Sequence, residues 1–169
     1  VTSVEEAKKI VELGAEKVAF SSAAINNINL LKEVGDIIGL QSVVVVLDYK
    51  KVGFFKKIEI FTHNGTKSTA LNLFDFIAKL DKIGVGEIVL NSIERDGKMN
   101  GYDISIVEKA RGIFSGPITV LGGAGNLNHI KELINKFKII GAAAGSLFVF
   151  KGKYKAVLIN YPSFEDLNK

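Results

Sequence analysis

The sequence predicts an α/β protein in which parallel strands alternate with helices, and three observations support that prediction. Short apolar segments alternate with amphipathic helical segments, at about 25 to 35 residues per strand-helix unit, as in right-handed βαβ crossovers. Residues 43–47 form an apolar run without polar alternation, which is typical of a strand buried on both faces. Polar residues and glycines recur where the apolar segments end.

In the first part of the chain, capping and turn residues mark the element boundaries. Ser3 is expected to cap the first helix, with Glu6 completing a capping box three residues later. Gly65 is expected near the turn of a small hairpin inserted into the alternation. The expected elements are a helix over residues 3–13, a strand over 17–21, a helix over 30–38, a strand over 42–48 and the hairpin around 58–62.

The second part of the chain continues the alternation. Asp103 and Asn126 are expected to cap the helices that follow them, and Pro117 is expected to open a strand. The expected elements are a helix over 73–83, a strand over 87–91, a helix over 104–113, a strand over 118–121, a helix over 128–137, a small-residue strand over 139–144, a helical turn over 146–150 and a terminal helix or its remnant over 154–159. Residues 1–169 are therefore expected to form a single domain with five strand-helix units.

Two architectures fit five such units, a doubly wound open sheet and a TIM (β/α)8 barrel. No G-x-G-x-x-G fingerprint follows an early strand, so the dinucleotide-binding open sheet is disfavoured. Polar residues and glycines at the ends of nearly every strand are typical of the active face of a barrel. We therefore expect the C-terminal part of a barrel, with three units of roughly 75 to 90 residues in total missing upstream.

Composition argues against several classes of function. The absence of cysteine excludes disulfides and thiolate metal sites and fits a reducing, cytoplasmic compartment. No apolar run has membrane-spanning length and no signal peptide is recognisable, so no membrane partner is expected. His63 and His129 are interpreted as surface or loop residues, and no metal site is expected. The net charge of +4 comes from scattered lysines, which favours a small anionic substrate over nucleic acid.

Asp48 and the loop at residues 91–103 are the first candidates for chemistry. Asp48 ends the most apolar strand, where a carboxylate is costly unless it is solvated, paired or used. A role as general acid or base is favoured over simple capping of the next turn. In the loop, the Asp96-Gly97 turn either presents backbone N–H groups to an anion or belongs to a merely solvated segment.

Gly122-Gly123 and Gly145-Ser146 each follow a strand and precede a helix. Glycine at such a position allows either a tight turn or the close approach of a phosphate to the backbone near a helix N-terminus. In barrels, the loops after the seventh and eighth strands commonly hold phosphate in this way. The two pairs would occupy those loops in a C-terminal barrel portion, so the phosphate interpretation is favoured.

Lys17 and Glu87 each open a strand, at the end opposite the candidate chemistry. Taken alone, they are interpreted as two solvated charges. If both side chains point inward, they would form an ion pair at the base of the barrel.

Six motifs together resemble a known family. EKVAFSSAA, QSVVVVLD, THNGTK, GEIVLNSIERDGKMNGYD, VLGGAGNLNH and AAAGSLF, in this order, are similar to the cyclase subunit of imidazole glycerol phosphate synthase, the HisF family, from residue 1 to about residue 150. The resemblance implies a (β/α)8 barrel that takes ammonia from a HisH-like glutaminase partner. It also implies that a nucleotide-derived substrate bearing two phosphates is split, giving imidazole glycerol phosphate and an aminoimidazole carboxamide ribotide in histidine biosynthesis. No cofactor is implied.

The resemblance also implies roles for individual residues. Asp48 matches the general acid/base and Asn91 a polar position near the reacting centre, while a partner aspartate on strand one lies outside this chain. Lys17 and Glu87 match a charged gate where ammonia enters, which reverses their first interpretation. The phosphate-binding positions are Ser21 and Ser22 for one phosphate, and Asp96, Gly97, Gly122, Gly123, Gly145 and Ser146 for the other.

Three departures from the family bear on the substrate. Ser21-Ser22 replace Asn followed by Thr or Ser, Leu121 replaces a small residue, and residues 155–169 replace the usual terminal helix. That ending resembles HisF-like paralogues encoded with surface-polysaccharide genes, which implies ammonia-dependent amidination of a sugar. A third possibility is a noncatalytic phosphate-binding barrel that activates a glutaminase. The 169-residue chain alone is expected to lack cyclase activity, because one catalytic carboxylate is missing.

Overall fold

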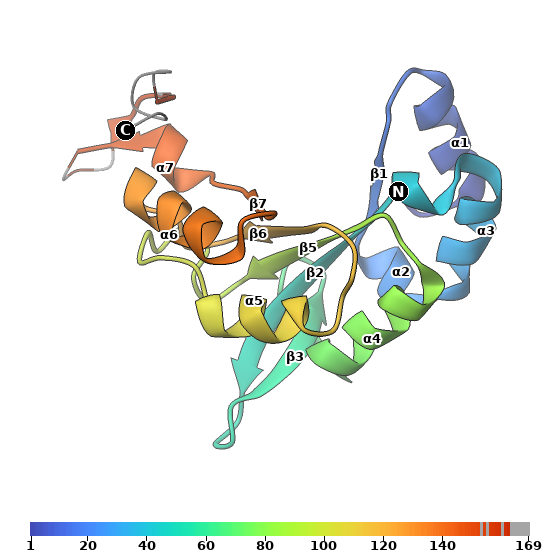
Figure 1. Cartoon of the computed structure of the whole chain (residues 1–169), viewed down its shortest axis with the longest axis horizontal. Helices are drawn as coiled ribbons and strands as arrows, with labels where there is room; N and C mark the ends of the chain where they lie inside the picture. The colour runs from blue at the N-terminus through green and yellow to red at the C-terminus, as the bar shows by residue number, and fades with distance from the viewer. Residues whose placement is uncertain (153, 155, 160, 163–169) are drawn as a thin grey trace.

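A computed structural model describes residues 1–152, 154, 156–159 and 161–162. They fold around a seven-stranded sheet with β2 near its centre (Figure 1). β2 (Val43–Val52) pairs in parallel with β1 (Val18–Phe20) and with β5 (Glu87–Ser92), and β6 (Ile118–Leu121) and β7 (Gly141–Ala142) continue in the same direction. The predicted α/β fold with five parallel strands is confirmed.

The predicted hairpin is also present, formed by β3 (Lys57–Thr62) and β4 (Lys67–Asn72). β2 runs to Val52, beyond its predicted end at residue 48, because its last five residues pair antiparallel with β3. The turn between β3 and β4 includes Gly65, at a φ of +77°. Asp48 therefore lies inside a strand with ladder partners on both sides.

Helices connect the strands, as the helical periodicity predicts. Their bounds are α1 (Val4–Glu12), α2 (Ser22–Asn26), α3 (Asn29–Ile38), α4 (Leu73–Ile83), α5 (Ile104–Arg111), α6 (Leu127–Phe137) and α7 (Ser146–Val149), with a 3-10 turn η1 (Leu40–Ser42) before β2. α2 and η1 are too short to show a period and were not predicted. None of the described helices is both long and apolar enough to cross a membrane.

The helix caps follow the sequence in two of three cases. Ser3 Oγ accepts a hydrogen bond from Glu6 N, and Asn126 Oδ1 accepts one from His129 N. The second hydrogen bond of the predicted capping box, from Ser3 N to the Glu6 carboxylate, is not formed. That carboxylate accepts hydrogen bonds from the Thr2 backbone N and hydroxyl instead. Asp103 precedes α5 but makes no capping bond, because its oxygens accept from Ser105 and Lys51.

The hydrophobic core lies on one face of the sheet. Val43, Val45, Leu47 and Tyr49 alternate along β2 and are at most 1% exposed, packed in one cluster with apolar residues of the helices. On the other face Val44 is 7% exposed and Val46 is only half-buried. The burial expected on both faces of residues 43–47 is therefore found at Val44 but not at Val46, and the described strands do not close into a barrel.

The end of the described chain differs from the prediction. β7 is confined to Gly141–Ala142, although Ala143 N still donates to Val120 O. The helix expected over 154–159 is wrong in its described part, since β9 (Ala156–Val157) pairs antiparallel with β8 (Phe150–Lys151). Gly152, at a φ of +75°, lies in the connection, and β-branched Val157 favours a strand. Most of the departure noted at residues 155–169 lies outside the described residues.

Candidate active site at the carboxyl edge of the sheet

The centre of the candidate site is a row of residues across three parallel strands. Asp48 of β2 is in register with Asn91 of β5, and Asn91 is in register with Leu121 of β6. Asn91 Nδ2 donates a hydrogen bond of 2.7 Å to Asp48 Oδ1. Asn91 Oδ1 is buried and accepts no hydrogen bond from any described residue. The carboxamide thus fixes one oxygen of the half-buried Asp48 carboxylate, while its own oxygen has no partner among the described residues.

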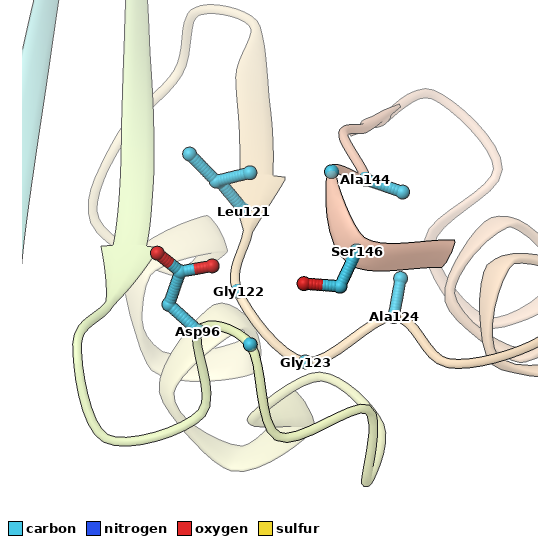
Figure 2. Close-up of a pocket in the computed structure, with 9 residues that line it drawn as sticks. Asp96, Leu121, Gly122, Gly123, Ala124, Ala144 and Ser146 are labelled. Carbon is cyan, nitrogen blue, oxygen red and sulfur yellow. The ribbon is translucent and has the colours of Figure 1, made fainter. Parts of the chain in front are cut away.

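A pocket lies at the same edge of the sheet (Figure 2). It contains about 200 Å³ of empty space, open solvent included. The Ser146 hydroxyl points toward the turn at Gly122, and Asp96 lies on the other side of that turn (Figure 2). The pocket is lined by Asp96, Gly97, Leu121, Gly122, Gly123, Ala124, Ala144, Gly145 and Ser146. Six residues proposed for one phosphate, distributed over three loops, are therefore brought together.

Glycine is required at two of the pocket positions. Gly122 and Gly123 have φ values of +91° and +115°, which disfavour any side chain. A Cβ on Gly123 would lie 2.1 Å from Gly101 O, and one on Gly122 would lie 2.7 Å from Ser92 O. Gly123 and Ala124 are buried, and their backbone N–H groups donate to no described residue. Unpaired N–H groups in such a turn favour an anion as the ligand.

The pocket adjoins the carboxylate. A Cβ on Gly122 would lie 3.3 Å from Asn91 Oδ1, so the amide that holds Asp48 borders the glycine turn. The parallel strands end at this edge, as expected for the active face of a βα architecture. The predicted acid/base residue and the second predicted anion site therefore share one rim.

The loop between β5 and α5 closes one side of the pocket. Gly101 N donates to Gly123 O at 2.7 Å, and a guanidinium nitrogen of Arg95 donates to Gly101 O at 2.9 Å. Tyr102 Oη donates to Ala143 O at 2.8 Å, and burial raises the pKa of Tyr102 to about 12. The hydroxyl therefore remains a donor at neutral pH. The loop is thus hydrogen-bonded to the segments that follow β6 and β7.

Ser21 and Ser22 lie apart from this pocket. They directly follow β1, so they lie at the carboxyl end of a strand parallel to β2. Both are half-buried, and the Ser21 hydroxyl does not cap α2. The structure thus places them at an edge suitable for a ligand but does not join them to the pocket lining.

Lys17 and Glu87 form an ion pair at the other end of the strands. Lys17 Nζ lies 2.7 Å from Glu87 Oε2, and Thr119 Oγ1 donates to Glu87 Oε1 at 2.7 Å. Burial alone would raise the pKa of Glu87, but the hydrogen bonds from Lys17 and Thr119 outweigh it and hold that pKa below its ordinary value. Glu87 is therefore ionised at neutral pH, and Thr119 is a partner of Glu87 that sequence reasoning missed.

The two histidines are placed as interpreted from the sequence. His63 is exposed in the β3–β4 turn, and His129 is half-buried in the first turn of α6, where its Nδ1 accepts from Gly125 N. Within the described residues, no three metal-ligating side chains gather into a possible metal site.

Comparisons with known proteins identify the family. A family model described as "Histidine biosynthesis protein" matches residues 1–155. A Leptospira borgpetersenii protein, provisionally named imidazole glycerol phosphate synthase subunit HisF, is 49% identical over 166 residues, covering 98% of this chain and 65% of that protein. A Vibrio vulnificus protein with a similar provisional name is 48% identical over 169 residues, covering 100% of this chain and 65% of that protein.

A relative whose name is not provisional is less similar in sequence. The imidazole glycerol phosphate synthase subunit HisF of Pelodictyon phaeoclathratiforme is 37% identical over 151 residues, covering 89% of this chain and 59% of that protein. The chain thus spans about 65% of the length of the first relatives it matches. It belongs to the histidine biosynthesis protein family, among the relatives of the imidazole glycerol phosphate synthase subunit HisF.

Proposed function

We propose that this chain forms strands four to eight of a (β/α)8 barrel and provides half of the active site of an ammonia-using cyclase, the HisF-type subunit of imidazole glycerol phosphate synthase. The observation that supports this most directly is the shared rim of Asp48, Asn91 and the glycine pocket. The greater length of the relatives and the uncovered sheet face fit a barrel whose first three units lie outside these residues.

In the proposed reaction, Asp48 transfers protons. Ammonia attacks an electrophilic carbon of the substrate, and the Asp48 carboxylate accepts a proton from the attacking nitrogen and returns one to the leaving oxygen. Asn91 holds Asp48 Oδ1, so that the other carboxylate oxygen is directed to the substrate. A second carboxylate, on strand one, would complete the acid/base pair.

The glycine pocket is proposed to bind one substrate phosphate. The N–H groups of Gly123 and Ala124 and the Ser146 hydroxyl would donate to its oxygens. The exposed Asp96 carboxylate would repel a phosphate, so we assign it to a hydroxyl beside that phosphate. Ser21 and Ser22 would bind the second phosphate with residues outside this chain.

The Lys17–Glu87 pair is proposed to close the ammonia entrance. It lies at the amino ends of the strands, opposite Asp48, where a glutaminase subunit would deliver ammonia. Lys17 and Thr119 each hold one oxygen of the Glu87 carboxylate, which keeps the pair in one arrangement at that end of the strands.

A sugar-amidating function is the second candidate, and Leu121 favours it. Leu121 lines the glycine pocket in register with Asn91, where its side chain occupies space that a small residue would leave to the ligand. The acceptor would then differ, while the ammonia source and Asp48 chemistry would be unchanged.

An isotope experiment on the full-length gene product distinguishes these functions. The protein is supplied with its glutaminase subunit, ¹⁵N-amide glutamine and, in separate reactions, the bis-phosphorylated HisF substrate or a nucleotide-linked sugar. We expect ¹⁵N in the imidazole ring. Label found in the sugar alone would support the second candidate, and glutaminase activation without label in either product would support the noncatalytic one.

A further inference from the structure

Lys51 contacts both ends of the loop that closes the pocket. It lies three residues beyond Asp48 in β2, where its backbone N donates to Glu94 Oε2 at 3.0 Å. Its side-chain Nζ lies 2.6 Å from Asp103 Oδ2. Glu94 is near the start of the loop at residues 93–103, and Asp103 is its last residue before α5.

The contact with Asp103 is the stronger of the two. The Asp103 side chain is 7% exposed, and the Lys51 side chain is 33% exposed. Burial alone would raise the pKa of Asp103, but hydrogen bonds from Lys51 and Ser105 outweigh it and hold that pKa below its ordinary value. Arg95 Nε approaches the same carboxylate only to 3.8 Å. Removal of Lys51 would therefore leave a buried carboxylate without its closest cation.

The loop held in this way carries two pocket residues at its middle. Asp96 and Gly97 line the pocket, and neither makes a backbone hydrogen bond to β2 in the described structure. Their positions depend on how the two ends of the loop are held. At the first end, Ile93 N donates to Tyr49 O and the Lys51 backbone N donates to Glu94, and at the last end the Lys51 side chain holds Asp103.

We infer that Lys51 is a positioning residue that keeps the loop at residues 93–103 in its ligand-binding arrangement and aligns the anion pocket with Asp48. The inference rests on the proposed function for its ligand, a phosphate, but the ordering of the loop is independent of that ligand. Lys51 acts through Glu94 and Asp103 and does not itself contact the substrate.

The test compares two neighbouring lysines in the full-length gene product. Lys51→Met removes the ion pair, whereas Lys50→Met removes an exposed lysine whose described contact is the Phe61 ring, 5.9 Å away. For Lys51→Met we expect faster amide hydrogen exchange at residues 94–102. We also expect about tenfold weaker binding of inorganic phosphate, equivalent to about 1.4 kcal/mol, because part of the binding free energy must then order the loop.

Kinetics separate positioning from general loss of structure. Lys51→Met should raise KM for the bis-phosphorylated substrate while kcat at saturation changes less than about twofold, and Lys51→Arg should restore KM. Lys50→Met should leave exchange, phosphate affinity and KM unchanged. Unchanged loop exchange in Lys51→Met overturns the inference. A wild-type protein that binds no phosphate contradicts the proposed function of the pocket, while faster exchange in Lys51→Met would still support the role of Lys51.

Discussion

The carboxamide of Asn91 donates a hydrogen bond to the carboxylate of Asp48 across two adjacent parallel strands. Both side chains are therefore held by the backbone of a sheet, rather than by a loop. The same amide borders Gly122 of the pocket. This relationship connects the predicted acid/base residue with the predicted anion site, and it leads to the first prediction.

Asp48→Asn in the full-length gene product should separate chemistry from binding. We expect ammonia-dependent turnover to fall by about 10³-fold, because an amide cannot exchange protons with the substrate. Binding of inorganic phosphate, measured by calorimetry, should be unchanged. Asp36→Asn, at an exposed position on α3, is the matched control and should keep full activity. Unchanged turnover in Asp48→Asn would remove Asp48 from the mechanism.

Gly123→Ala should destabilise the fold, whereas Gly145→Ala should not. The added methyl group at residue 123 would meet Gly101 O at a backbone φ of +115°, so we expect the free energy of unfolding to fall by at least about 2 kcal/mol. A Cβ on Gly145 meets no atom within 4 Å, at a φ of −112°, and its effect should stay within about 0.5 kcal/mol. Chemical denaturation measures both, and equal losses would contradict the close-approach explanation.

Glu87 should make stability depend on acid pH. Its pKa in the folded protein is lowered, so the ionised form stabilises the fold above the unfolded pKa, and this contribution is lost as pH falls through the folded pKa. Denaturation of wild type and Glu87→Gln should give a difference in unfolding free energy that shrinks below about pH 4.5. Thr119→Val should raise the Glu87 pKa, measured by carboxyl ¹³C NMR. A constant difference across this range would argue against the ion pair.

The 169-residue chain by itself should lack cyclase activity and associate with itself. In the proposed mechanism a second carboxylate lies outside this chain, and on one face of the sheet Val46 and Asn91 are only half-buried. Sedimentation should show concentration-dependent oligomers, and assays with ammonium salts should show no turnover. A monodisperse monomer or measurable turnover would each contradict this prediction.

Local sequence signals predicted most of the fold. The strand over 118–121 and the helix over 73–83 are found with the predicted bounds, because apolar periodicity and the following glycine Gly84 or Gly122 define their ends. The pocket could also be predicted, because the glycine positions and the order of strands and helices can be read directly from the sequence. Its six predicted residues come from loops that follow parallel strands, which must end at one edge.

Two contacts between distant segments escaped prediction. Lys51 and Asp103 are 52 positions apart, and a lysine among several scattered lysines gives no signal for its partner. Thr119 looked like an ordinary strand residue. Only the pairing of β5 with β6, in which Thr119 is in register with Val89, brings its hydroxyl within hydrogen-bond distance of Glu87. The helix predicted over residues 154–159, where β9 pairs with β8, was wrong for a different reason. A short apolar segment is compatible with either a helix or a strand until its pairing partner is known.

The extension of β2 past Asp48 has a consequence for catalysis. Asp48 is in register with Phe61 of β3 on one side and with Asn91 of β5 on the other, so its backbone is fixed before any ligand arrives. In the proposed mechanism, substrate binding therefore does not need to order the backbone of Asp48, and the entropic cost of ordering falls on the surrounding loops. If a conformational step limits the rate of turnover, it should therefore be a rearrangement of those loops, while β2 keeps the same conformation.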